Sequence, residues 1–151
     1  MAARDQTSKD LTAGAERLAL SKCLLFMEAF RDVRRLMPLQ HAYAFLLVAL
    51  EEGRSVSEYA KRASVTQAVM TRILFALGSR SQGRERGYGL VQQGTDTEDA
   101  RKHQTFLTAK GKALKGQIAR LVRSDQRDLM KLRSPDLTAV ADQARDIARD
   151  Q

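Results

Sequence analysis

Two short amphipathic stretches separated by a tight turn constrain the fold of this chain more than any other feature. The first, residues 56–63, opens with a capping-box pattern: Ser55 can accept a hydrogen bond from the third backbone N–H, and Glu58 can reach back to the first residue. Residues 63–65 predict a tight turn, and residues 66–77 predict a second helix with apolar residues at helical spacing. This order is that of a helix-turn-helix.

The segment that follows predicts a wing. Residues 78–89 combine glycine, serine and arginine and are expected to form an exposed loop. Short strands are expected at residues 90–92 and 104–108, with a polar hairpin tip over residues 94–102. The predicted fold class is therefore mainly α with a small three-stranded β wing, a winged helix-turn-helix.

Long helices are expected on both sides of this module. A helix over residues 11–36 is apolar on more than one face, which suits a subunit interface; its stripe is Leu20, Cys23, Leu24, Met27 and Phe30. A second helix should follow Pro38 and be the most buried one, with Phe45 and Val48 beside a stripe of Leu39, Tyr43, Leu46, Leu47 and Leu50.

Two more helices are expected after the wing. Thr108 caps the first, whose apolar residues are Leu114, Ile118, Leu121, Val122, Leu129 and Leu132. Ser134-Pro135 predicts the start of the last one. We therefore expect an N-terminal dimerisation helix at residues 1–36, a DNA-binding domain at 37–111 and C-terminal dimerisation helices at 112–151.

The positive charge is concentrated in the middle of the chain. The net charge is +8, and residues 54–115 carry twelve basic and five acidic side chains, which is +7 of that excess. Such a local basic stretch is typical of a module that binds a polyanion, although a solvated basic surface would look the same. Trp is absent and aromatic residues make up 5% of the chain, so stacking platforms for single-stranded nucleic acid are not expected.

Three segments carry a resemblance to a known family. Residues 55–62 read SVSEYAKR, residues 65–74 read VTQAVMTRIL, and residues 96–101 read DTEDAR, followed by LTAKG at 107–111. In order and spacing they resemble the supporting helix, the recognition helix and the wing signature of the MarR family of bacterial winged-helix regulators. The resemblance covers residues 37–122 and implies the same fold.

The resemblance also implies which residues face double-stranded DNA. Those from the recognition helix are Thr66, Gln67, Ala68, Thr71 and Arg72. Arg101 and Lys102 would lie at the wing tip, where an arginine can enter the minor groove, and Asp99 would pair with an arginine to shape the wing.

The sequence departs from the family at three places. The loop over 78–89 is longer than usual, and Arg84 and Arg86 either add phosphate contacts or belong to a disordered loop. Phe75 stands where the family usually has a charged residue, and we expect it to pack under that loop. Thr105 replaces the usual apolar wing residue.

Other chemistry is not expected. His41, His103 and Cys23 lie far apart in sequence, so we expect no metal, no cofactor and no enzyme activity. Cys23 is expected to be buried on its apolar stripe and unreactive, with peroxide sensing through Tyr43 as the alternative. No anion clamp is recognisable, so no effector is predicted. No apolar run reaches the length of a membrane span, and we expect a cytoplasmic protein.

The expected function is a sequence-specific transcriptional regulator, more often a repressor in this family, that acts as a homodimer on a palindromic operator. A sequence-tolerant DNA-architectural or mobile-element accessory protein on the same fold is the alternative. A protein-binding module that has lost DNA binding is a further one, against which the basic middle of the chain argues.

Overall fold

The computed structural model describes residues 2–79, 86–95 and 103–125. Of the described residues, those between 28 and 119 form one compact unit, and residues 2–27 and 120–125 belong to a second. The elements in chain order are α1 (Ala2–Val33), α2 (Leu39–Leu50), β1 (Arg54–Ser55), α3 (Val56–Arg62), α4 (Gln67–Leu77), β2 (Val91–Thr95), β3 (His103–Leu107) and α5 (Ala109–Arg123). The expected fold class, helical with a three-stranded antiparallel wing sheet of order β1-β3-β2, is confirmed.

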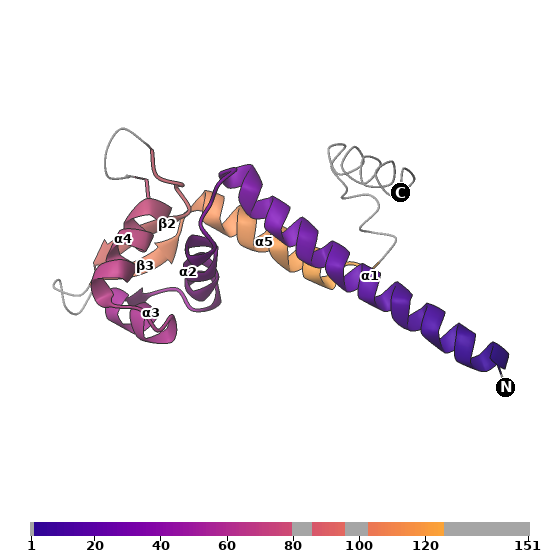
Figure 1. Cartoon of the computed structure of the whole chain (residues 1–151). Helices are drawn as coiled ribbons and strands as arrows, with labels where there is room; N and C mark the ends of the chain where they lie inside the picture. Colours follow the sequence, from indigo (N-terminus) through magenta and orange to yellow (C-terminus); the bar gives the residue numbers. More distant parts are fainter. Residues whose placement is uncertain (1, 80–85, 96–102, 126–151) are drawn as a thin grey trace. The chain divides into compact units, whose positions relative to one another are not determined.

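The core of the unit over residues 28–119 lies between the helices and the sheet. α4 packs against both α2 and α3, and the strands lie beside them (Figure 1). Four of the five residues expected to point inward from this helix are buried, namely Met70, Ile73, Leu74 and Leu77, whereas the fifth, Val65, lies before α4 and is half-buried. The rings of Phe30 in α1 and Phe45 in α2 meet edge to face, with centroids 5.7 Å apart. The helical spacing read from the sequence therefore placed the core of this unit correctly for α4.

Three expected helices differ from the observed ones. α1 begins nine residues earlier than expected, at Ala2, and ends at Val33, before the turn that precedes Pro38. On α2, Leu39, Tyr43 and Leu50 are exposed, and the buried face is Ala42, Ala44, Phe45, Leu47, Val48 and Ala49. Small residues on that face let α2 approach its neighbours closely, a preference that apolar periodicity does not reveal.

α5 ends at Arg123, where residues 124 and 125 leave the helix. Leu114, Ile118 and Leu121 are buried as expected, whereas Val122 is exposed. The expected positions of Leu129 and Leu132, and the helix expected from Ser134, lie outside the described residues. None of the described helices combines the length and apolar character needed to cross a membrane.

A hydrogen bond links the two segments of the second unit. Lys22 in α1 donates a hydrogen bond from Nζ to the carbonyl oxygen of Val122 at 2.9 Å, near the end of α5. A cation at the C-terminal end of a helix satisfies an orphan carbonyl and complements the helix dipole. Leu20, Leu24 and Met27 are exposed on the same part of α1.

The wing hairpin pairs β2 with β3 over five residues, from Val91 opposite Leu107 to Thr95 opposite His103. β2 is longer than the expected strand, because it continues to Thr95. Thr105, where the resemblance led us to expect an apolar residue, is fully buried, and its hydroxyl has no hydrogen-bond partner among the described residues. Thr105 therefore places a hydroxyl group without a hydrogen-bond partner in an apolar part of the core, which is rare for a buried polar atom.

The LTAKG segment joins the wing to α5 through a close backbone contact. The Thr108 hydroxyl donates to the carbonyl oxygen of Gly89 at 2.6 Å and accepts from the backbone N–H of Gly111 at 3.1 Å. A Cβ on Gly111 would collide with the carbonyl oxygen of Leu90. Glycine is required here for the close approach of two backbones rather than for an unusual φ.

We predict that Gly111→Ala destabilises the protein by about 3 kcal/mol, because the added methyl group has no space beside the Leu90 carbonyl. Urea unfolding followed by circular dichroism measures this. The matched control is Gly14→Ala in α1, where a Cβ meets nothing within 4 Å. That change should raise stability by about 0.5 kcal/mol, as alanine does in a helix interior. Equal effects of the two substitutions would contradict the proposed backbone contact.

Candidate nucleic-acid interface

The turn between α3 and α4 is closed by a Schellman motif. The backbone N–H of Val65 donates to the carbonyl oxygen of Ala60 at 3.1 Å, and that of Ser64 donates to Lys61 at 3.2 Å. Ser64 has φ +54°, the left-handed conformation that this motif requires. The motif ends α3 sharply, so that α4 can begin two residues later.

Side-chain caps hold the starts of both helices. The expected capping box is present: Ser55 Oγ accepts from the backbone N–H of Glu58 at 3.3 Å, and Glu58 Oε2 accepts from the backbone N–H of Ser55 at 2.8 Å. At the start of α4, Thr66 Oγ1 accepts from the backbone N–H of Val69 at 3.3 Å. Thr66 is thus the N-cap of α4, and its side-chain oxygen accepts a hydrogen bond from a backbone N–H of the first turn.

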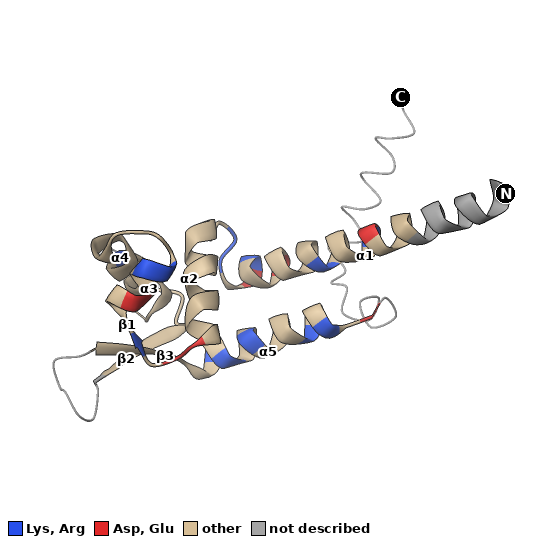
Figure 2. Cartoon of the chain, turned by 90° about the horizontal axis from the view of Figure 1, so that it is seen from below, with Lys and Arg blue, Asp and Glu red and all other residues tan. Residues whose placement is uncertain are grey.

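The outward side of α4 carries the residues expected to face DNA. Gln67, Ala68, Thr71 and Arg72 are all exposed, and the helix contains no acidic residue (Figure 2). The Thr71 hydroxyl donates to the carbonyl oxygen of Gln67 at 2.8 Å, so it offers only an acceptor and a methyl group to a ligand. The residues that were expected to face DNA from the recognition helix therefore all lie on α4 or, for Thr66, at its N-cap.

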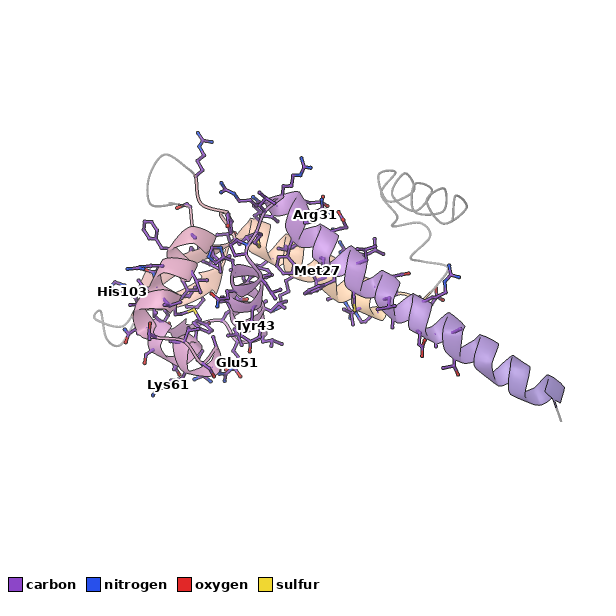
Figure 3. All side chains as sticks on the ribbon, viewed as in Figure 1. Met27, Arg31, Tyr43, Glu51, Lys61 and His103 are labelled. Carbon is purple, nitrogen blue, oxygen red and sulfur yellow. The ribbon has the colours of Figure 1, made fainter. Side chains whose placement is uncertain are left out.

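Part of the positive charge counted in the sequence is neutralised nearby. Arg62 Nη2 lies 2.8 Å from Glu51 Oε2, and Arg54 lies 3.1 Å from the same oxygen. Arg54 also lies 3.2 Å from Glu58 Oε1. The hydrogen bond from Arg62 lowers the pKa of Glu51, so that this carboxylate stays charged. Lys61 is exposed on α3, and its side chain and that of Glu51 are labelled in Figure 3.

Of the basic residues expected in the loop and the wing, the structure describes only Arg86. Arg86 is exposed, and its carbonyl oxygen accepts a hydrogen bond from Arg34 Nη1 at 3.2 Å. Arg84, Arg101, Lys102 and Asp99 lie outside the described residues, so the expectations for them remain predictions.

A half-buried polar cluster anchors the chain just after that loop. His41 Nδ1 lies 3.1 Å from the Tyr88 hydroxyl, and the Arg34 guanidinium lies 5.3 Å from the centre of the Tyr88 ring. Burial lowers the pKa of His41, which favours the neutral imidazole. The sequence analysis missed this cluster, because its three residues are spread over more than fifty positions of the chain.

The structure also places Cys23, which the sequence analysis considered as a soft ligand. Cys23 is exposed in this chain, whereas we expected it to be buried. Its neighbours on the stripe, Leu20, Leu24 and Met27, are exposed as well, whereas Phe30 at the end of the stripe is buried against Phe45. In the described ranges, no three His, Cys, Asp or Glu side chains lie close enough together to hold a metal ion.

The arrangement of these elements is that of a winged-helix protein: a capped two-helix motif followed by a β-hairpin. The sequence matches no protein-family model and no curated protein. Solved structures do match, and they show that the chain has the winged-helix fold of MarR-like regulators.

A MarR-like transcriptional regulator from Thermotoga maritima is 24% identical; the match covers 90% of this chain and 94% of that one, with a TM-score of 0.54. The YusO protein from Bacillus subtilis is 16% identical over 97% and 98% of the two chains, with a TM-score of 0.53. A mutant MarR from E. coli complexed with operator DNA is 21% identical over 92% and 93%, with a TM-score of 0.51.

We predict that Glu58→Gln reduces the dependence of stability on pH between about pH 3 and pH 6. Hydrogen bonds from the Ser55 backbone N–H and hydroxyl lower the pKa of Glu58 in the folded protein. A lowered pKa stabilises the fold above the unfolded value, and this stabilisation is lost as the pH falls through the folded value. Urea midpoints measured over this range should converge for wild type and variant at low pH.

The variant Ser55→Ala provides the check on the cause. It removes a hydroxyl that donates to the same carboxylate at 2.9 Å, and should reduce the pH dependence in the same direction. Parallel stability curves for wild type and both variants would contradict the role of the capping box.

Proposed function

We propose that this protein is a sequence-specific transcriptional regulator that binds double-stranded DNA through α4. The observation that carries the proposal is the exposed face of α4, which offers a cation, an amide and a hydroxyl oxygen and no acidic group. A helix of this size fits the major groove, where such side chains distinguish base pairs by hydrogen bonding. The amide of Gln67 suits adenine, and the guanidinium of Arg72 suits guanine.

The MarR structure from E. coli supports the proposal, because that protein has the same fold and was solved in complex with operator DNA. The similar protein from Thermotoga maritima is described as a transcriptional regulator, and none of the three descriptions names an enzyme. We extend the regulatory role, and the absence of catalysis, to this chain as part of the proposal.

We further propose that the protein acts as a homodimer. Leu20, Leu24 and Met27 recur at helical spacing on α1 and are all exposed, Leu20 at 69%. An apolar stripe of this kind on a helix is typical of an interface with another protein. Two-fold symmetry of a dimer would be matched by a palindromic operator, and a dimer bound there would act as a repressor in the cytoplasm.

Selection of bound fragments from a random duplex pool at near-physiological salt tests the proposal. We expect a palindrome whose half-sites lie about one helical turn apart, because each protomer presents one α4 to the major groove. Binding without an enriched motif would favour the architectural alternative. Absence of binding to any duplex would exclude both DNA-binding functions and leave a protein partner.

Substitutions on the two predicted contact elements should act differently. Arg72→Ala should weaken binding to the selected duplex tenfold to a hundredfold, since a bidentate base contact contributes about 1–3 kcal/mol. Arg101→Ala should weaken binding and lower the slope of log affinity against log salt by about one, because a charge near the backbone is lost. Fluorescence anisotropy titrations at several salt concentrations measure both effects.

Arg17→Ala is the matched control for these two variants. Arg17 is an exposed arginine of α1 in the other compact unit, and its loss changes the net charge equally. We expect it to leave affinity within about twofold of wild type. Unchanged affinity in Arg72→Ala and Arg101→Ala would refute the assigned contact face.

A further inference from the structure

Phe75 is an apolar residue in the middle of the polar face of α4. Its side chain is 42% exposed, although the buried side of the same helix has Met70, Ile73, Leu74 and Leu77 in place. Phe75 is therefore a surface residue of α4 and not one of its buried residues. We expected Phe75 to pack under the loop over residues 78–89. That expectation does not explain why 42% of the side chain is exposed.

The helical geometry places Phe75 among the residues proposed to contact DNA. At about 100° per residue, Gln67, Thr71, Ala68 and Arg72 span about 140° of the helix circumference, and Phe75 lies about 80° into that arc. Thr71 and Arg72 are four and three residues before it, which makes them its direct neighbours on the helix surface. Ala68 lies seven residues before it, on the same line.

This line of the helix is more apolar than its sequence indicates. The Thr71 hydroxyl hydrogen is used within the helix, on the Gln67 carbonyl. What Ala68, Thr71 and Phe75 present outward is therefore two methyl groups, an acceptor oxygen and an aromatic ring. In the major groove, the one apolar group among the base edges is the C5 methyl of thymine.

We propose that Phe75 is a specificity-determining residue that reads the C5 methyl group of a thymine in the major groove. The inference rests on the proposed DNA binding. It adds one thymine to the bases that α4 is proposed to contact. The 1.5 Å rise per residue separates Phe75 from Ala68 by about 10 Å, or about three base pairs if α4 follows the groove. The thymine read by Phe75 is thus expected about three base pairs from the base nearest Ala68.

Replacing thymines of the selected duplex with deoxyuridine, one at a time, tests this contact because it removes only the methyl group. Affinities of the full-length protein for each duplex are measured by fluorescence anisotropy at fixed salt. For wild type, one replacement in a half-site should weaken binding about fourfold, the value of one buried methyl. For Phe75→Ala, the same replacement should cost less than about twofold, because its partner is already absent.

Val69→Ala is the matched control. Val69 is also an exposed apolar residue of α4, at 36%, but it lies about 120° around the helix from Phe75. The Val69→Ala variant should keep the wild-type sensitivity to deoxyuridine at every position. Thermal unfolding of all variants shows whether the ring is instead part of the core, since a partly exposed Phe75 should cost little stability on truncation.

The outcomes separate this inference from the proposed function. Binding of a selected palindrome with every deoxyuridine tolerated by wild type would overturn the role of Phe75 and leave the regulator intact. A methyl-sensitive position that Phe75→Ala leaves equally sensitive would assign the contact to another residue and also overturn it. Failure of wild type to bind any duplex would overturn the proposed function itself. The wild-type series can overturn the inference without any variant, and if Phe75→Ala folds poorly, Phe75→Leu, which keeps an apolar side chain, replaces it in assigning the contact.

Discussion

The three residues from Tyr88 to Leu90 hold the winged-helix module together. Their backbone N–H groups donate to the carbonyl oxygens of Ala76, Gly78 and Leu77 at the end of α4, at 2.8–2.9 Å. Their carbonyl oxygens accept from Thr108 and Lys110 at the start of α5. Because one short segment bonds to both helices, the positions of α4, the wing and the first turn of α5 are coupled. The glycine at position 111 follows from this constraint, since only a residue without a Cβ lets α5 approach Leu90.

The basic residues of the winged-helix module differ in whether a carboxylate lies beside them. Arg54 and Arg62 are bonded to the carboxylates of Glu51, just after α2, and of Glu58 in α3, at the surface, where such pairs contribute little to stability. Arg72 stands on a helix without acidic residues. A count of basic residues therefore overstates the charge available to DNA, and the position of each cation relative to nearby carboxylates decides its use.

The face of α4 combines hydrogen-bonding groups with an apolar line, and these two kinds of group suit different parts of a base-pair edge. Arg72 and Gln67 match the acceptors and donors of guanine and adenine, while Phe75 and Ala68 match a methyl group. Thr71 lies between the two sets, with its donor bound inside the helix. Such a surface would distinguish base pairs by contact with the thymine methyl group as well as by hydrogen bonds. Its selectivity would then not depend on charge alone.

Local patterns in the sequence determined the two-helix motif, its capping box, the buried side of α4 and the wing, because caps, turns and helical periodicity act over a few residues. Tertiary structure alone decided which side of α2 is buried, since the helices that cover it come from distant parts of the chain. It also decided that Cys23 and Phe75 are exposed, and that His41, Tyr88 and Arg34 meet. Apolar spacing shows that a side chain is suited to burial, but only the neighbours brought together by folding determine whether anything covers it.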